Sequence, residues 1–376
     1  MKIDFKKTPD QIELVKAMGS KNEATAREAQ EAFAAFIGPI IQTVLQQAGS
    51  ANLIYSEKEY DEDDSPSLPL DLYYDKTQVD YIQTWSQSMA GGLPTSQVEG
   101  ISEMKISTYR LDTAVSFLKK YARKSRLDVI AKATERMAQE ILIKQERNAW
   151  AVLLKALAEA STNSTKHVIR SGTESIFNAN DLSRLMTLLR RIHSSWAGGT
   201  PTSTESAGIT DLFVSPEIKE QIRGFAFNAM NTVGAGGVAI VSNDARNNGI
   251  PLPDAIREQI FRSGGTSEIY GVAITDLLEL GTTRKYNVLF KEFAAGDTAM
   301  GHGGAFDSSD DELLVGVDLT SEAFIRPVAR QADSGGQFTV LPDDQWVSRS
   351  DKAGFYGWLE EGRVVIDSRN IVGIVV

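Results

Sequence analysis

The sequence predicts an α+β fold organised around one long helix. Residues 126–160 contain neither glycine nor proline, and their apolar positions recur at steps of three and four, which is typical of one face of a helix. The region after residue 208 instead alternates short apolar runs with glycine-rich turns, which predicts strands. The 376 residues contain no evident internal repeat and can bury a large core, which we expect to be divided between two lobes.

A first helix is predicted at residues 22–48, where large apolar residues recur at helical spacing. Gly38-Pro39 lies inside it, so we expect a kink or a break there, because proline removes a backbone donor and clashes with the preceding turn. The apolar face of this helix packs either on its own domain or on a neighbouring subunit. The sequence leaves both alternatives open.

An acidic run, EKEYDEDD, occupies residues 57–64. We interpret it as a solvated segment, or as one that faces a basic patch on another subunit. Arg123, Lys124 and Arg126 are a candidate for such a patch, although the sequence favours the alternative that these charges simply flank a helix. A calcium loop is not expected, because Pro66 stands where a glycine would be required after Asp61.

Residues 75–110 contain Gly91-Gly92, Pro94 and Gly100, and end in an alternating stretch at 101–109. This pattern predicts an extended two-stranded excursion from the body of the protein. Residues 111–124 then lead into the long helix, with Ser125 expected as its N-cap and Asp128 as the partner in a capping box. A helix over 126–160 would be roughly 50 Å long at 1.5 Å per residue.

A third helix is predicted at 179–196, capped by Asn180 or Asp181, and the Gly/Ser/Thr-rich stretch 197–208 is expected to be a linker. A short strand at 212–214 is followed by a helix that begins with Ser215-Pro216, since proline is favoured in a first helical turn. Further strands are predicted at 268–274, 288–290, 313–319, 323–328, 338–341, 356–359, 363–366 and 371–376.

Motifs for catalysis are formally present but lack their context. Residues 234–239 (GAGGVA) fit the dinucleotide pattern, yet a helix precedes them and a strand follows, which is the wrong order, so we interpret them as a loop. Residues 116–119 (SFLK) fit the S-x-x-K motif without its companion motifs, and we expect Ser116 and Lys119 on a solvated helical face.

Metal and membrane functions are not expected. The chain has no cysteine, and His167, His193 and His302 are too far apart in sequence for metal-ligand spacing, so we expect them to be surface or loop residues. The net charge of −11 disfavours a general nucleic-acid binder. No apolar run of 18 residues and no signal peptide occur, which predicts a protein made in the cytoplasm. We therefore predict no catalytic, cofactor-binding or metal-binding residues.

The order of these parts resembles the major capsid protein of tailed double-stranded DNA bacteriophages, with its Hong Kong 97-type fold. The resemblance covers nearly the whole chain and is clearest at 101–160 and 311–376. It is carried by the excursion before the long helix, by the strand and Pro-started helix of DLFVSPEIKEQIRGFA, and by the β-rich ending KAGFYGWLEEGRVVIDSRNIVGIVV. The implied regions are an N-terminal arm (1–53), an extended loop or E-loop (75–112), a peripheral or P domain (54–74, 113–199 and 326–367) with a spine helix at 126–160, and an axial or A domain (200–325 and 368–376).

The resemblance implies a shell protein without enzymatic activity, which forms the hexamers and pentamers of an icosahedral head around phage DNA. It places the chain in the virion, after synthesis in the host cytoplasm. Implied partners are copies of itself, a separate scaffolding protein, a portal, decoration proteins, and DNA contacted non-specifically. Some members of the family crosslink Lys to Asn. Here Lys76 and Lys105 lie in the implied E-loop, and Asn370 lies near the C-terminus. Nothing in the sequence marks these residues as reactive, and we expect no crosslink.

Two alternatives remain at this point. An encapsulin, a bacterial cargo compartment, would share the fold, and its contents would distinguish it from a phage head. A two-lobed enzyme with a helical hinge would need polar side chains that converge in a cleft, and the sequence offers no such set.

Overall fold

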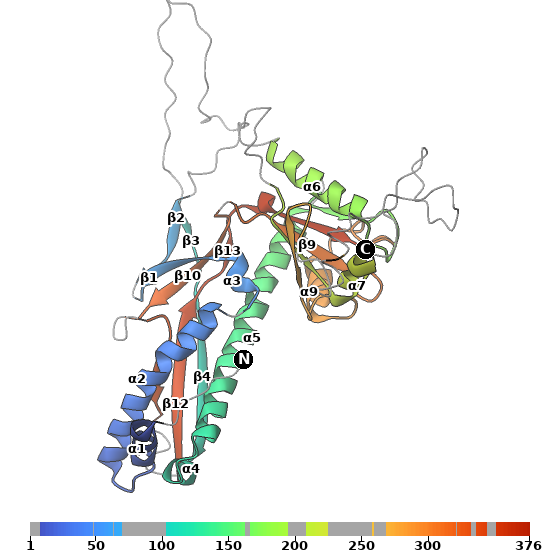
Figure 1. Ribbon diagram of the computed structural model, residues 1–376. Coiled ribbons are helices and arrows are strands. Elements are labelled where there is room, and N and C mark those ends of the chain that lie inside the picture. The colour runs from blue at the N-terminus through green and yellow to red at the C-terminus, as the bar shows by residue number, and fades with distance from the viewer. Residues whose placement is uncertain are drawn as a thin grey trace, which may run out of the picture. The chain divides into compact units, whose positions relative to one another are not determined.

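The computed structural model in Figure 1 describes residues 8–47, 49–62, 64–69, 103–161, 166–194, 208–224, 258, 268–320, 322–331, 336–343 and 351–376. The chain divides into two compact units. Unit 1 comprises Met1–Leu68, Met104–Ala149 and Phe324–Val364, and unit 2 comprises Pro69–Glu103, Trp150–Ala323 and Val365–Val376. The predicted long helix is present as α5 (Leu127–Ala160), and the division between the units falls within it.

The boundary expected between the P and A domains, at residues 199/200, lies inside unit 2 and does not coincide with the division between the two units.

The sheet of unit 1 has the strand order β1-β10-β12-β11, with β4 paired to β12 and β13 paired to β10. The strands β4 and β12 are antiparallel over ten residues each, from Leu118 opposite Lys352 to Tyr109 opposite Glu361. The edge strand β1 runs parallel to β10. Their bounds are β1 (Ser56–Asp61), β4 (Tyr109–Leu118), β10 (Phe324–Arg330), β11 (Thr339–Pro342), β12 (Lys352–Glu361) and β13 (Val364–Val365). A separate pair of short strands, β2 (Ser67–Pro69) and β3 (Glu103–Lys105), stands at the two ends of the 70–102 segment.

One face of this sheet is covered by helices. The apolar residues of α1 (Pro9–Met18), of α2 (Glu23–Gln47) and of the first half of α5 share one core with the inward side chains of β4, β11 and β12. The Phe355 ring at its centre lies 5.6 Å from the Phe33 ring and 6.0 Å from the Phe117 ring. Of the two alternatives for the N-terminal helix, the structure shows packing on its own unit. Between α2 and β1 lies the short α3 (Ala51–Ile54).

A kink or a break was predicted at Gly38-Pro39. The helix α2 continues through these residues, so the break was wrong, whereas the kink stays a prediction. Buried residues on both sides of the proline, Phe33, Ile37 and Ile41, remain on the same face. The backbone donor that Pro39 lacks is a local loss, and burial of this apolar face along the whole helix outweighs it.

The start of α5 also differs from the prediction. Ser125 has a left-handed φ of 53°, and its N–H donates to the Ala122 carbonyl at 2.8 Å, while the Arg126 N–H donates to the Tyr121 carbonyl at 3.0 Å. These two bonds form a Schellman motif, so Ser125 terminates the preceding α4 (Lys119–Arg123). The Ser125 hydroxyl is buried without a hydrogen-bond partner in the described part of the chain. The predicted capping box with Asp128 was therefore wrong.

The sheet of unit 2 has the order β5-β14-β9-β6-β8-β7, and its strands β9 and β14 are buried on both faces. One face packs on α6 (Ala179–Ser194) and α7 (Pro216–Gly224). Trp150, from the second half of α5, lies with its ring 5.0 Å from the Phe213 ring of β6 and 5.5 Å from the Tyr286 ring of α9 (Lys285–Phe293). The strands are β5 (Val168–Arg170), β6 (Asp211–Val214), β7 (Glu268–Ile269), β8 (Val272–Asp276), β9 (Leu313–Val317) and β14 (Ile371–Val375), which follows the short η3 (Ser368–Asn370).

The start of α7 follows the sequence closely, whereas that of α6 does not. Ser215 Oγ accepts a hydrogen bond from the Ile218 N–H at 3.0 Å, which caps the Pro-started α7. The helix α6 begins at Ala179, so the predicted caps Asn180 and Asp181 lie inside its first turn and not at the N-cap. From there the Asp181 carboxylate accepts from the Asn178 N–H at 3.2 Å and from the Gly172 N–H at 3.0 Å. The predicted linker 197–208 lies outside the described residues except for Gly208.

Three local predictions were wrong. The expected strand at 288–290 lies within the helix α9, whose buried residues Tyr286, Asn287 and Phe290 have helical spacing. The expected single strand at 268–274 is the hairpin of β7 and β8, because Tyr270 and Gly271 both have positive φ and turn the chain. Residues 111–118 belong to the strand β4 and are not part of a helical approach.

Candidate assembly surfaces

A cluster of buried charges lies in unit 1 where β12 ends. The side chain of Glu361 is fully buried, and its Oε2 accepts from Arg326 Nε at 2.8 Å, from Gln145 Nε2 at 3.0 Å and from Arg363 Nη2 at 3.4 Å. Its Oε1 accepts from the Tyr109 hydroxyl at 2.8 Å. One carboxylate thereby joins β4, β10, β12 and α5. We call these five residues the Glu361 cluster.

The cluster holds more positive charge than Glu361 alone can neutralise. Arg363 has two buried nitrogens, Nε and Nη1, without a hydrogen-bond partner among the described residues, but its guanidinium lies 5.0 Å from the centre of the Tyr55 ring. Glu57 of β1 approaches Arg326 Nη1 to 3.9 Å. Burial raises the pKa of Glu57, and the nearby Arg326 only partly opposes this increase. Burial likewise raises the pKa of Tyr109, which keeps its hydroxyl protonated as a donor to Glu361.

The position of Tyr109 gives the cluster its structural role. Tyr109 is the first residue of β4, shortly after the segment 70–102 returns through β3. Because Glu361 binds both Tyr109 and Gln145 of α5, the base of the predicted E-loop is fixed to the helix by charged hydrogen bonds, which are stronger than neutral ones. The tip of the predicted E-loop lies outside the described residues.

The opposite face of the unit 1 sheet carries exposed polar side chains, Arg110 and Asp112, and half-buried aromatic ones. The Arg110 guanidinium lies 4.8 Å from the centre of the Trp358 ring, and its Nε donates to Asp112 at 2.7 Å. The ring of Tyr356 lies 5.3 Å from that of Trp358. Tyrosine, tryptophan and arginine are enriched in protein interfaces, so this face is a candidate contact surface.

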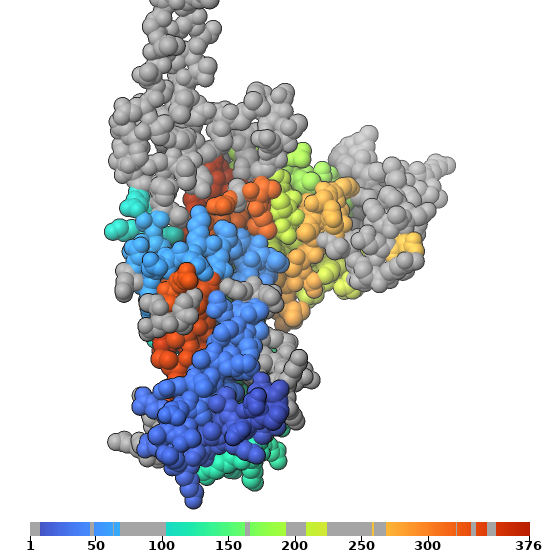
Figure 2. Space-filling model, turned by 60° about the vertical axis from the view of Figure 1, so that its left-hand side comes forward, coloured from blue at the N-terminus to red at the C-terminus, as the bar shows by residue number. Residues whose placement is uncertain are grey.

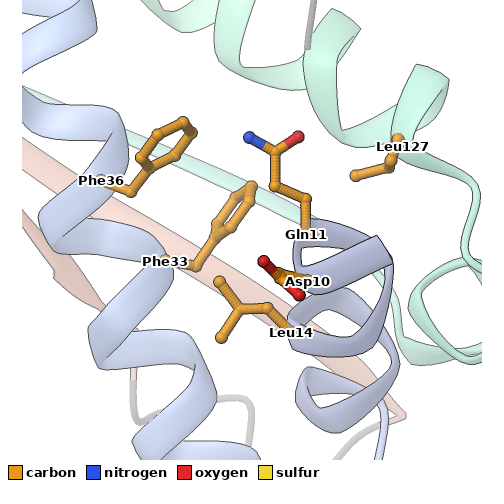
Figure 3. A pocket seen from close by; sticks show the side chains of 6 residues that line it. All are labelled: Asp10, Gln11, Leu14, Phe33, Phe36 and Leu127. Carbon is orange, nitrogen blue, oxygen red and sulfur yellow. The ribbon is translucent and has the colours of Figure 1, made fainter. Parts of the chain in front are cut away.

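A pocket of about 300 Å³ opens between the N-terminal helices and the start of α5 (Figure 3). Phe33 and Phe36 reach into it from α2, Leu14 lies beside them on α1, and Leu127 approaches from α5. Phe36 is 41% exposed. Asp10 is the only titratable residue of its lining, so the pocket offers no acid–base pair or nucleophile for catalysis.

The histidines lie in separate environments. His167 lies in the loop before β5, in line with the predicted surface or loop position, but it is buried, and its Nδ1 donates to the Ile371 carbonyl at 2.9 Å. Burial lowers the pKa of His167. His302 lies in a loop, where its Nε2 is 3.1 Å from Ser171 Oγ. His193 belongs to α6. In the described part of the chain, no three His, Cys, Asp or Glu residues are arranged to hold a metal ion.

The remaining sequence candidates do not converge. Ser116 lies in β4, and Lys119 is buried at the start of α4, so the predicted solvated face with both residues was wrong. Asn370 is buried in unit 2, Lys105 lies in β3, and Lys76 falls outside the described residues, as do residues 234–239. No helix of the described residues has the length and apolar character needed to cross a bilayer.

Comparison with solved structures identifies the fold. A capsid structure of the cyanophage P-SCSP1u matches with a TM-score of 0.51 and 11% identity, over 85% of this chain and 86% of that chain. The chain has the Hong Kong 97-type capsid fold. The predicted α+β class and fold are thus confirmed.

Two further structures match at lower TM-scores. A structure from the Microbacterium phage Oxtober96 gives 0.49 at 12% identity, over 88% of this chain and 91% of that chain. The holo-SrpI encapsulin complex from Synechococcus elongatus PCC 7942 gives 0.45 at 9% identity, over 88% of both chains. Of these three structures, the cyanophage capsid alone has a TM-score above 0.5, so the fold assignment rests on it. No protein-family model matches the chain, and no curated protein matches its sequence.

Proposed function

We propose that this chain is the major capsid protein of a tailed double-stranded DNA bacteriophage. The observation that carries the proposal is the fold likeness to the cyanophage capsid structure, which extends over 85% of this chain and does not stop at a single lobe. A shell role also agrees with the half-buried aromatic and exposed arginine side chains on the sheet face opposite the helices.

In this proposal, copies of the chain form hexamers and pentamers that build an icosahedral head. Residues 1–53 act as the N-terminal arm, 75–112 as the E-loop, 54–74, 113–199 and 326–367 as the P domain, and 200–325 with 368–376 as the A domain. Contacts between copies bury area that the single chain leaves exposed, such as the Phe36 ring. The net charge of −11 limits adhesion of the wall to packaged DNA, which is contacted non-specifically.

Partners of the shell would be a separate scaffolding protein, a portal and decoration proteins, with the chain located in the virion after synthesis in the host cytoplasm. We propose no enzymatic activity and no covalent crosslink. The buried position of the Asn370 side chain supports the latter point, since a lysine of another copy could not reach it without local unfolding.

Electron microscopy of the purified full chain tests this function. The chain is produced alone and together with the scaffolding protein of the same source, and closed shells are expected in at least one case. Persistent monomers under both conditions and across a range of salt would refute a shell role. The contents of the particles decide between the two shell functions: DNA and a portal indicate a phage head, whereas an enzyme cargo indicates an encapsulin.

A further inference from the structure

The edge strand β1 of unit 1 presents a strip of negative charge. Its residues and the turn after it carry five carboxylates, Glu57, Glu59, Asp61, Glu62 and Asp64, which we call the acidic edge, and one cation, Lys58. Glu57 pairs with Arg326, and Glu59 accepts a hydrogen bond from Gln337, both within the same unit. Asp61, the last residue of β1, and Asp64, in the turn after it, are exposed. In the described sheet, β1 pairs only with β10, so its second edge is open.

The other end of unit 1 presents positive charge. The last turn of α1, the turn after it and the α4–α5 junction bring six exposed cations to this end, which we call the basic end: Lys16, Lys21, Lys120, Arg123, Lys124 and Arg126. Arg123 is held within the unit, because it donates to the Gly19 carbonyl at 2.7 Å and pairs with Asp351 at 3.0 Å. For Lys124 and Arg126, no carboxylate partner is found in the described residues.

These two charged surfaces cannot neutralise each other within one chain. The strand β12 has Lys352 opposite Leu118, next to α4, and Glu361 at its other end, beside β10 and β1. Asp61 pairs with Arg330 of β10, which is level with Leu359 of β12. The seven steps from Leu359 to Lys352 span about 23 Å at 3.3 Å per residue. Figure 1 shows the same arrangement, with α1 and α4 at one end of β12 and β1 toward the other. Screening at physiological salt acts over about 8 Å, so attraction across the unit is negligible.

The space-filling view shows the segments that carry the basic end together at one end of unit 1. The helices α1 and α2 form the lower end of the unit in this view, with the chain around α4 beside them (Figure 2). The contact between α1 and α4 is close, since a Cβ placed on Gly19 would lie 2.7 Å from the backbone nitrogen of Arg123. The cations are therefore presented by packed helices in a defined arrangement, which is a requirement for a specific interface.

We propose that the acidic edge of one copy docks on the basic end of a second copy of this chain. The inference rests on the proposed shell function and adds the surfaces through which copies meet. A contact between two different patches of the same chain is heterologous, so it propagates from copy to copy and closes when the rotation permits. Charge complementarity fixes the orientation of the copies and makes the contact sensitive to salt.

Charge reversal at each surface, alone and together, tests the proposal. Asp61→Lys with Asp64→Lys reverses the acidic edge, and Lys124→Glu with Arg126→Glu reverses the basic end. Each double variant places like charges opposite each other, and we expect each contact to weaken by about tenfold or more, with a corresponding loss of shells on electron micrographs and in sedimentation. The chain with all four substitutions restores opposite charges and should regain shells with the salt sensitivity of the wild type.

Glu174→Lys with Glu220→Lys is the matched control, because it changes the net charge as much as the acidic-edge variant does but at exposed positions of unit 2. Circular dichroism and urea midpoints verify that each variant folds. If the wild type forms shells and the single-surface variants assemble equally well, the docking inference is wrong and the shell function stands. Equal loss in the control, or failure of the four-substitution chain to recover, also overturns it. A wild type that never assembles refutes the shell function itself.

Discussion

Arg326 Nε lies 2.8 Å from Glu361 Oε2, and their side chains are 3% and 0% exposed. A buried ion pair of this kind does not by itself increase stability over an apolar pair, but removal of one partner leaves the other charge unneutralised. In this chain the consequence is larger, because Arg363 and Gln145 share the same carboxylate.

We therefore predict that Glu361→Gln lowers the free energy of unfolding by about 3–5 kcal/mol, because two buried arginines lose their common counter-charge. Urea denaturation followed by circular dichroism measures this loss. Glu31→Gln is the control, since Glu31 pairs with Arg27 at 3.1 Å on the exposed side of α2 and should cost no more than about 0.5 kcal/mol. Similar losses in the two variants would show that the Glu361 cluster is not a structural centre.

The long helix should not tolerate a proline in its interior. Ala138 is fully buried in the unit 1 core, and Ala138→Pro should cost about 3 kcal/mol or more, because it removes a helical hydrogen bond and clashes with the preceding turn. We expect no shells from this variant in electron micrographs. Asp128→Pro, in the first turn of α5, is the control and should assemble, since the first helical turn accepts proline. Normal shells from Ala138→Pro would contradict the spine role of α5.

His167 should make stability depend on pH. Burial lowers its pKa in the folded state below the ordinary value of 6.5, so the unfolded chain binds the proton more readily. The stabilisation is complete above about pH 6.5 and decreases as the pH falls through that value toward the folded pKa, by up to about 1.4 kcal/mol per pH unit. Urea midpoints between pH 8 and pH 5 should therefore fall more steeply for the wild type than for His167→Gln. Parallel curves would mean that this imidazole stays protonated to the same degree in both states.

A side chain at position 19 should destabilise the contact of α1 with α4. A Cβ there would lie 2.7 Å from the backbone nitrogen of Arg123, which cannot move without displacing α4. We predict that Gly19→Ala lowers stability by about 1–3 kcal/mol through overpacking. Gly296→Ala is the comparison, because nothing lies within 4 Å of a Cβ at that position. A neutral Gly19→Ala, measured by thermal unfolding, would show that α1 is free to shift away from α4.

The sequence predicts the elements whose pattern is local. The helix α5 and the Pro-started α7 are present nearly as predicted, because unbroken helical periodicity and the Ser215-Pro216 start are sufficient signals. The segment at 285–293 is a helix although three of its residues, Val288 to Phe290, suggest a strand. A run of three apolar residues is compatible with the repeat of a helix and with that of a strand. Burial of Tyr286 and Phe290 on one face favours the helix.

The Glu361 cluster was not predicted, although part of its signal is visible. In β12 the buried positions alternate from Phe355 through Gly357 and Leu359, and the same alternation places Glu361 inside. Arg326 is likewise the one charged residue among the six buried positions of β10, Phe324 to Ala329. The pairing of these residues with Gln145 and Tyr109 depends on contacts between distant segments, and sequence periodicity carries no information about those contacts.

The pairing of β1 with β10 sets a condition on the synthesis of the protein. The Ser56 hydroxyl donates to the Phe324 carbonyl, 268 residues away in the chain. At about 5–20 residues per second, a ribosome needs roughly 10 to 50 s to produce the intervening chain. A nascent or prematurely terminated polypeptide therefore lacks the partner that orders β1. Only a nearly complete chain can form this strand pair, so incomplete products lack one of the two surfaces proposed for docking.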